Sequence, residues 1–512
     1  MLTFEAYSAG VARADVDLSG AYVFAQDGIP VRADLVARGN QIDCMKNSPG
    51  PAGLAVMWDV GENGKYLLST TRLRDRKKPY NLNLELARAR MMRLYQKRED
   101  WSLFDRDEAK ECNEEFDKIR RVFIEALQLD VTDPPGASLL ADEALNEAML
   151  FGEKMALLQA RLILRRRTSG RRIPFGTSVS IDDDVQAMEK RIVGTMDFLS
   201  VPTPWRLCEP NEGKASFEQI DKWMNFAARQ GLAVHAGPLV SFAPEELPEW
   251  AFLRQGDDFA ALRTMIGNQI DRVVTRYAKH VRLWNVAAGL HCVNSFNLSF
   301  EQISELTRLV CRQVKTLAPQ SQVLLDIPLP WGEYYARNQR TVPPLLFADM
   351  AYQNDIKFDA FGLHLEMGVA TDGYFVRDLL EIGARLDEFS PYGKAIHITA
   401  CQVPSSDKPD PLASWGLGED VTRAGRWHQP WSPRLQAEWL QAIYRLAMGR
   451  GAVESICWGN LGDLGGHYLP NGGLVDARGK GKLAYRELRD LRSGKRKHSH
   501  GHHHSHHDAE EQ

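Results

Sequence analysis

The chain has 512 residues, a formal net charge of −4, 44% hydrophobic residues and 25% charged residues. This length exceeds what a single hydrophobic core usually supports, and the composition is that of an ordinary globular protein, so we expect two or three domains. The small net charge excludes the strong basic field that gathers nucleic acid or anionic membrane, and we expect neither as a partner.

The seven cysteines are spread along the chain without a CxxC pair, which is typical of free thiols in a reducing compartment. The N-terminus has neither a basic start nor an apolar run of signal-peptide length, and no stretch is long and apolar enough to span a membrane. The sequence therefore predicts a cytoplasmic protein without disulfides, and nothing in it requires a cofactor. It does not indicate an oligomeric state.

The N-terminal region divides into two parts. Residues 20–72 consist of short runs of alternating polar and apolar positions broken by Gly, Asn, Asp and Pro, so we expect residues 1–75 to form a small β-sandwich-like module. Residues 76–172 change to a helical period, with Phe116, Ile119 and Phe123 on one face, and predict a helical segment of two or three helices.

From residue 173 to residue 492, short apolar runs alternate with amphipathic helical stretches, as in successive βα units around a parallel sheet. Eight such units, with no dinucleotide or phosphate-loop glycine motif, favour a (β/α)8 TIM barrel of the α/β class. Active sites of such barrels lie at the C-terminal ends of the strands. The predicted strands are 176–181, 197–202, 233–240, 281–287, 322–327, 358–364, 395–400 and 454–460.

The last segment, residues 493–512, is rich in histidine and in polar and charged residues, and we expect it to be disordered because it cannot form a packed core. Clustered imidazoles bind divalent transition metals. A weak metal site is therefore predicted there, and casual affinity without a biological role is an equal alternative. Its ligands are His502, His503, His504, His506 and His507.

Three stretches of the predicted barrel carry longer motifs. Residues 205–213 read WRLCEPNEG, residues 280–291 read HVRLWNVAAGLH, and residues 457–466 read CWGNLGDLGG. They resemble, in turn, the segment after strand 2, the strand 4 motif, and the eighth strand with its closing loop in glycoside hydrolase family 10, the xylanase-type barrels. The resemblance implies a TIM barrel with a carbohydrate ligand.

The same resemblance implies that the chemistry of the family is missing. Retaining glycosidases use one carboxylic acid to protonate the leaving oxygen and one carboxylate to attack the anomeric carbon. With Trp284 on the Trp of the strand 4 motif, Gly289 takes the place of the acid–base glutamate. On strand 7 the family ends in Ile-Thr-Glu, whereas this chain ends in Ala400, in place of the nucleophile. We therefore expect a divergent, catalytically impaired homologue, a pseudoenzyme.

Sugar binding is expected to persist at the strand ends. By the resemblance, Trp458 forms the floor of the site and stacks on the apolar face of a pyranose, and a purely structural tryptophan is the alternative. The remaining residues that we assign to ligand binding are Trp205, Trp284, Asn285, His364 and Asn460.

Other groups at strand ends offer substitute chemistry. Glu333 and Glu366 follow the adjacent fifth and sixth strands, and two carboxyl groups about 5–10 Å apart would restore a hydrolase. Cys401 directly follows Ala400, but its sequence neighbours give no sign of an activated thiol. Further acid–base candidates are Asp463, His291, His364 and His467.

The leading hypothesis is a family 10-like protein of carbohydrate metabolism that binds β-linked polysaccharide or oligosaccharide and is catalytically impaired. The first alternative is an active, xylanase-like O-glycosyl hydrolase that uses relocated carboxylates. The second is a non-catalytic scaffold whose N-terminal region binds a protein. The N-terminal module itself is open to two interpretations, carbohydrate binding or packing, because the fold alone does not settle the function.

Overall fold

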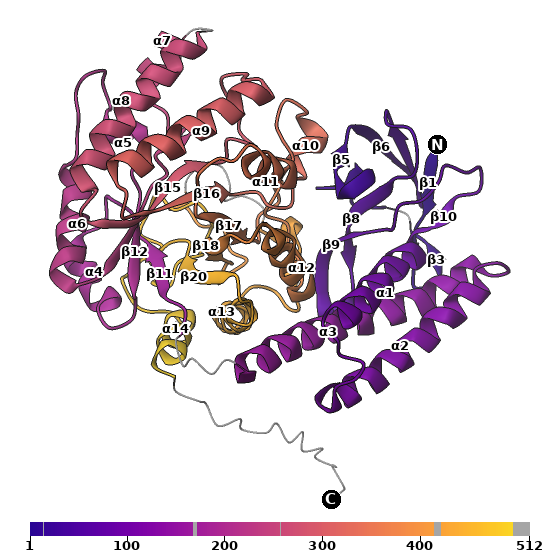
Figure 1. Ribbon diagram of the computed structural model, residues 1–512. Helices are drawn as coiled ribbons and strands as arrows, with labels where there is room; N and C mark the ends of the chain where they lie inside the picture. Colours follow the sequence, from indigo (N-terminus) through magenta and orange to yellow (C-terminus); the bar gives the residue numbers. More distant parts are fainter. Residues whose placement is uncertain (14, 167–171, 256–257, 414–420, 495–512) are drawn as a thin grey trace, which may run out of the picture.

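The computed structural model describes residues 1–13, 15–166, 172–255, 258–413 and 421–494. In these residues a TIM barrel packs beside a smaller body of two β-sheets and three helices, which we call the N-terminal module (Figure 1). Among the described helices, none has the length and apolar character needed to cross a membrane.

Two small sheets form the β part of the N-terminal module. The first has the order β10-β1-β7-β6, and the second has the order β19-β9-β8-β4-β5. Leu2, Phe4 and Ile42 of the first sheet are fully buried, which places the core between the sheets and the helices. The strands are β1 Leu2–Glu5, β4 Tyr22–Phe24, β5 Pro30–Val31, β6 Ala33–Arg38, β7 Gln41–Lys46, β8 Gly53–Asp59, β9 Gly64–Ser69, β10 Tyr80–Asn81 and β19 Arg426–Trp427, with a separate pair β2 Tyr7–Ser8 and β3 Val11–Ala12.

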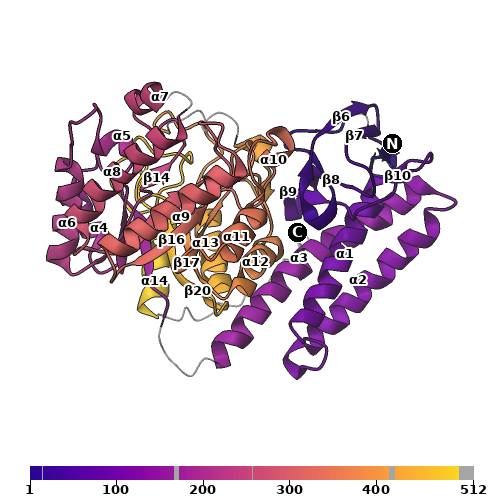
Figure 2. The same cartoon turned by 45° about the horizontal axis from the view of Figure 1, so that its top comes forward.

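Three long helices complete the N-terminal module: α1 Leu82–Asp100, α2 Lys110–Leu129 and α3 Pro134–Arg166. Helix α3 carries a buried stripe of small residues at intervals of three or four, and these let neighbouring helices approach closely. It packs against α1 and α2 of the module and against α12 and α13 of the barrel, so it joins the two bodies (Figure 2). The stripe is Ala137, Ala141, Ala144, Ala148, Gly152, Ala156 and Ala160.

Eight parallel strands form the closed barrel. They follow one another in the order β11, β12, β13, β15, β16, β17, β18 and β20, and β20 pairs with β11 to close the ring. This confirms the predicted (β/α)8 TIM barrel preceded by β-rich and helical parts. The strands are β11 Phe175–Ser178, β12 Phe198–Val201, β13 Ala233–Ala236, β15 Val281–Ala288, β16 Gln322–Ile327, β17 Ala360–Glu366, β18 Ala395–Gln402 and β20 Val453–Trp458, and β14 Val240–Ser241 pairs beside the end of β15.

Amphipathic helices surround the barrel and cover its apolar strands. In α9, for example, Ser299 and Gln302 form a capping box at the N-terminus, and Ile303, Leu306 and Val310 face the core. The helices are α4 Val185–Ile192, α6 Glu218–Gln230, α8 Phe259–Tyr277, α9 Phe300–Leu317, α11 Pro344–Gln353, α12 Leu379–Phe389, α13 Pro433–Met448 and α14 Leu483–Ser493, with the shorter α5 Trp205–Cys208, α7 Glu249–Gln255 and α10 Tyr334–Arg337.

The N-terminal module is tied to loops at the C-terminal ends of the barrel strands. Strand β19 belongs to the loop after β18, yet it pairs with β9 of the module. Arg90 of α1 forms a buried ion pair with Asp378 at 2.6 Å. The module predicted for residues 1–75 thus includes a strand from the barrel's own loop, and one continuous hydrophobic core runs through both bodies.

Candidate functional site

The barrel mouth consists of the C-terminal ends of the eight strands and the loops that follow them, and its centre is Asp326 at the end of β16. This buried carboxylate accepts hydrogen bonds from Asn285 Nδ2 of β15 at 2.7 Å and from Thr399 Oγ1 of β18 at 2.7 Å. His364 Nε2 of β17 lies 3.1 Å from the same carboxylate. The carboxylate of β16 therefore links side chains from β15, β17 and β18.

The pair of Asp326 and His364 shifts the protonation of both partners. Burial opposes the imidazolium, but the charge of Asp326 and hydrogen bonds to Asp326 and Glu366 outweigh burial and raise the pKa of His364 to about 10. Burial likewise opposes the carboxylate, yet the charge and hydrogen bonds of its partners hold the pKa of Asp326 below its usual value. At neutral pH the pair is an imidazolium beside a carboxylate.

Glu366, the last residue of β17, is held at the mouth by two partners. Its Oε1 accepts a hydrogen bond from Gln402 Nε2 at 2.8 Å, and its Oε2 lies 3.4 Å from His364 Nδ1. The side chains of His364 and Glu366 are 21% and 11% exposed, so both remain within reach of a small ligand. The structure brings together the predicted residues Asn285, His364 and Glu366.

The loop after β14 brings two further carboxyl groups to the mouth, Glu245 and Glu246. Tyr468, from the loop after β20, donates its hydroxyl to Glu245 Oε1 at 3.3 Å, and its ring is 37% exposed. Burial and the charges of Glu246, Glu245 and Glu366 raise the pKa of Tyr468, which places its phenol among all three carboxyl groups. Burial and the charge of Glu366 also raise the pKa of the half-buried Tyr374.

Sequence reasoning missed these tyrosines and the Glu245–Glu246 pair. They lie on loops rather than on strand ends, and a barrel pattern does not predict where a loop side chain turns. The dipeptide of two glutamates a few residues after the third strand was the one available signal, because carboxyl groups with perturbed pKa values cluster at functional sites.

The predicted tryptophans are all core residues. Trp458 and Trp284 are 0% exposed, and the indole of Trp458 donates to the carbonyl oxygen of Gly472 at 2.9 Å. Trp205 is also buried and donates to Glu209 at 3.1 Å. None of these three rings offers an exposed face to a ligand in this structure. Asn460 is half-buried and donates to the carbonyl oxygen of Gly462 at 2.9 Å.

Glu333, the other predicted substitute carboxylate, is engaged in an ion pair of its own. Its side chain is fully buried and pairs with the guanidinium of Arg377, which also lies over the ring of Trp331 with its Cζ 4.4 Å from the centroid. This contact lies beside Tyr22 of the N-terminal module, whose pKa responds to both Glu333 and Arg377. The structure shows no contact between Glu333 and Glu366.

The positions expected to hold the catalytic pair offer little room for it. Gly289 has a φ of +69°, and a Cβ there would lie 3.2 Å from Pro328 Cγ and 3.3 Å from Cys292 Sγ. A glutamate at residue 289 would therefore meet both strain and crowding. Ala400 is 9% exposed on β18 and leaves only a methyl group at the mouth.

Two other predicted groups are inert by their surroundings. Burial raises the pKa of the Cys401 thiol well above its usual value, and the remaining cysteines are also free and buried. His291 is fully buried against Tyr334 and Phe347, and burial lowers its pKa to about 3, so it is neutral at physiological pH. Neither group is suited to proton transfer or nucleophilic attack.

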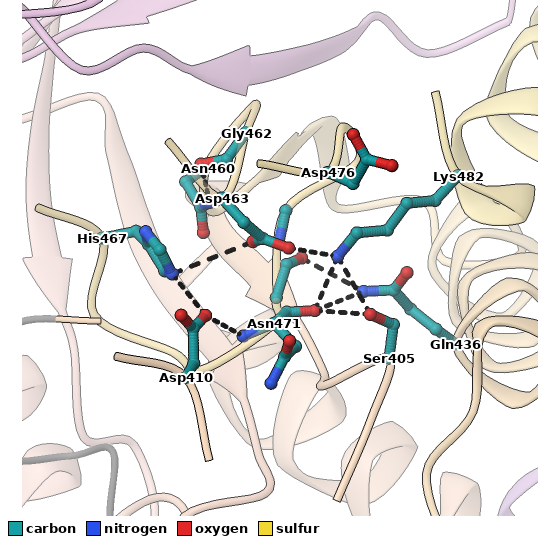
Figure 3. Close-up of polar contacts among 12 residues, drawn as sticks. Ser405, Asp410, Gln436, Asn460, Gly462, Asp463, His467, Asn471, Asp476 and Lys482 are labelled. Carbon is teal, nitrogen blue, oxygen red and sulfur yellow. Dashed lines mark hydrogen bonds and ion pairs between the residues drawn. The ribbon is translucent and has the colours of Figure 1, made fainter. Parts of the chain in front are cut away.

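The loops after β18 and β20 are joined by a polar network that we call the loop clasp, made of Asp410, Asp463, His467 and Lys482 (Figure 3). His467 Nε2 lies 2.8 Å from Asp410 Oδ2 and 3.9 Å from Asp463 Oδ1. Lys482 forms an ion pair with Asp463 and donates to Ser405 Oγ at 2.9 Å.

Two carboxylates and an imidazole within 4.8 Å of one another match the spacing of metal ligands. In the loop clasp, however, the ammonium group of Lys482 already neutralises Asp463, and backbone N–H groups of Asn471 and Gly473 donate to Asp410 and Asp463 at 2.8 and 2.6 Å. Both carboxylates of the clasp therefore already have partners within the two loops, and we assign no metal to it. The predicted histidine ligands at residues 502–507 lie outside the described residues.

Comparisons with known proteins point to one family. The profile of glycosyl hydrolase family 10 matches residues 185–294, from α4 to the loop after β15. The chain is 26% identical over 265 residues to endo-1,4-beta-xylanase B of Humicola insolens, covering 49% of this chain and 58% of the relative. It is 27% identical over 159 residues to endo-1,4-beta-xylanase 3 of Hypocrea jecorina, covering 30% of this chain and 43% of the relative.

The matched regions span little more than half of the first of these relatives and less than half of the second. Among solved structures, the chain is similar to GH10 from Paenibacillus barcinonensis, with 16% identity, a TM-score of 0.47 and coverage of 63% of this chain and 95% of that one. It is also similar to xylanase 10B from Thermotoga petrophila RKU-1 in complex with xylobiose, with 17% identity, a TM-score of 0.47 and coverage of 66% and 97%. The profile and sequence matches support a relationship between the barrel and glycosyl hydrolase family 10.

Proposed function

We propose that this protein binds β-linked polysaccharide or oligosaccharide at the barrel mouth and does not use the covalent mechanism of the retaining xylanases. The observation that carries the proposal is the half-exposed ring of Tyr468 beside a group of carboxylates. An aromatic face packs on the apolar C–H face of a sugar, and carboxylates accept hydrogen bonds from its hydroxyl groups.

The polar groups at the mouth have unused capacity for hydrogen bonds. Among the described residues, Asn285 Oδ1, Gln402 Oε1 and Glu246 Oε2 are buried acceptors without a hydrogen-bond partner in the structure. Unsatisfied buried acceptors are costly, and a ligand rich in hydroxyl donors would relieve that cost where it reaches them. This supports a polyol ligand rather than an apolar one.

The same mouth lacks the groups for double displacement. No carboxylate replaces the expected acid–base residue at Gly289 or the expected nucleophile at Ala400, and Glu333 is engaged with Arg377. A glycosyl ester needs a carboxylate next to the anomeric carbon. We therefore propose carbohydrate binding without the double displacement of the retaining hydrolases.

The relatives suggest which sugars to test first. Two of them are named endo-1,4-beta-xylanases, and one solved structure contains xylobiose. We propose β-1,4-linked xylose or glucose chains as the first ligand class. A glycan array probed with the full chain tests this directly, and we expect signal on β-linked oligosaccharides. An array with no β-linked hits would overturn the proposal.

Covalent chemistry is tested separately with a 2-deoxy-2-fluoro β-xylobioside that carries a dinitrophenyl leaving group. Such a compound traps the glycosyl ester of a retaining enzyme, which intact-mass spectrometry detects as an added sugar. We expect no adduct, because the structure offers no nucleophile at residue 400. A stoichiometric adduct would show that the double displacement survives in another form.

A further inference from the structure

We propose that Glu246 and Glu366 form a relocated acid–base pair, in which Glu246 donates a proton to the glycosidic oxygen and Glu366 activates a water molecule, so that β-glycosides are hydrolysed with inversion. The inference rests on the proposed carbohydrate ligand and goes beyond it. It replaces the pair expected from the sequence, because Glu333 is held by Arg377 and only Glu366 of that pair lies at the mouth.

Topology places the two carboxyl groups on different sides of the mouth. Glu246 lies on the loop that follows β14, the short strand that pairs with the end of β15, and Glu366 ends β17, which is separated from β15 by β16 in the ring of eight. The backbone at Glu246 is fixed, because its N–H donates to the carbonyl of Ala243 and its carbonyl accepts from Arg206 N–H, both at 2.9 Å. Its Oε2 is buried and has no hydrogen-bond partner among the described residues.

The surroundings of Glu246 keep part of its carboxyl population protonated at neutral pH. Burial is the largest cause that raises its pKa to about 7; a hydrogen bond with Ser241 and the charge of His364 act against it, while Glu245 and Asp326 add to it. The groups that act on it are Glu245 from its own loop, Ser241 of β14, Asp326 of β16, His364 of β17 and Tyr468 from the loop after β20. A pKa near the working pH suits a general acid.

Glu366 has the opposite environment. It accepts hydrogen bonds from the Gln402 amide and the His364 imidazolium, donors that suit an anionic carboxylate. Glycosidases divide the roles of acid and base between two carboxyl groups whose environments differ.

The proposed reaction is a single-displacement hydrolysis by one water molecule. The C1–O bond of the glycoside breaks as the Glu246 carboxyl proton moves to the leaving oxygen, and a water oxygen forms a new bond to C1 as Glu366 accepts one water proton. One glycoside and one water give two free sugars with inversion at C1. Proton exchange with solvent then returns Glu246 to its acid form and Glu366 to its carboxylate. No covalent sugar ester forms, which agrees with the alanine at residue 400.

The first test is the protonation of Glu246 itself. Carbon-13 NMR of the glutamate side-chain carboxyls, assigned by comparing the wild type with Glu246→Gln, follows its titration in the full chain without any substrate. We expect a midpoint near pH 7. A midpoint at the ordinary glutamate value, about 4.3, would overturn the proposal.

The second test is turnover of the β-1,4-xylo- and cello-oligosaccharides. Glu246→Gln is expected to reduce kcat for an unactivated tetrasaccharide at least 100-fold. The same variant should lose less than tenfold on a dinitrophenyl xylobioside, whose leaving group needs no proton. Glu366→Gln is expected to lose at least 100-fold on both substrates, and the exposed neighbour Glu249→Gln serves as the control.

The anomeric configuration of the first product distinguishes this inverting mechanism from residual retaining xylanase activity. Proton NMR of the first product should show the α-anomer, and a first product in the β-form would overturn the proposal. If the wild type binds oligosaccharide but releases no sugar, the acid–base pair is wrong and the proposed binding function stands. If it neither binds nor hydrolyses, both proposals are wrong.

Discussion

Asp326 is the residue on which the mouth depends most, because side chains from three strands converge on its carboxylate. His364 is the charged one of these three partners. Its pKa of about 10 in the folded chain lies well above the ordinary value of about 6.5. The folded state therefore binds this proton more tightly than the unfolded state does, and the pair links stability to pH.

We predict a pH dependence of stability with a definite sign. Because the folded pKa of His364 is raised, its stabilising contribution is complete below about pH 6.5 and is lost as the pH rises toward 10. Urea unfolding of the wild type and His364→Gln at several pH values measures this contribution. The difference in unfolding free energy should shrink from pH 6.5 to pH 10. A constant difference over that range would contradict the assigned ion pair.

Which aromatic side chain reaches the mouth could not be predicted from the sequence. The resemblance assigned Trp458 to a sugar site, but its ring is fully buried in the core. The exposed aromatic side chain at the mouth is that of Tyr468. Both residues lie in the same strand-and-loop segment, and the resemblance does not indicate which side chain of that segment reaches the mouth. Which aromatic residue reaches the mouth depends on the path of the loop, and that path depends on contacts such as the bond from Tyr468 to Glu245.

At the scale of loops, the clasp holds the segments after β18 and β20 together around a buried lysine. Lys482→Met is predicted to remove the ammonium partner of Asp463, which costs about 3 to 5 kcal/mol for a buried pair. Thermal denaturation should therefore show a clear fall in Tm. Lys480→Met, at an exposed position on the same loop, is the matched control. Equal Tm values for the two variants would show that the clasp contributes nothing to stability.

The contact between α3 and the loop around β19 is the second element-scale link. Glu153 accepts hydrogen bonds from Trp427 Nε1 at 2.7 Å and from Leu379 N–H at 3.0 Å, and lies 2.8 Å from His428 Nε2. Glu153→Ala leaves the buried N–H groups of Trp427 and Leu379 without this acceptor, at about 1 to 3 kcal/mol for each group, and removes the partner of His428.

We therefore predict a loss of roughly 3 kcal/mol in unfolding free energy for Glu153→Ala, measured by urea denaturation. Glu147→Ala removes an exposed glutamate from the same helix and should change little. If the Glu153 variant unfolds like the control, the N-terminal module is not fastened to the barrel through this side chain.

For the whole molecule, periodicity was sufficient to predict the barrel, because each βα unit repeats the same alternation of a buried strand and an amphipathic helix. The β-rich and helical character of the N-terminal region followed from the same patterns. Sequence patterns did not reveal that β19 completes a sheet of that region, since a two-residue strand inside a long loop carries no period. Neither did they show Arg377 engaging Glu333, a contact between the loops that follow β17 and β16 of the barrel.

The measurement that tests carbohydrate binding at the mouth most directly is calorimetric titration with a thio-linked β-1,4 tetrasaccharide, which is not hydrolysed during the experiment. We expect saturable binding to the wild type and to Tyr352→Ala, which removes an exposed tyrosine from α11 outside the mouth. Tyr468→Ala should weaken binding about tenfold, the effect of losing roughly 1.4 kcal/mol of stacking. No binding by the wild type, or equal binding by both tyrosine variants, would contradict a carbohydrate site built around Tyr468.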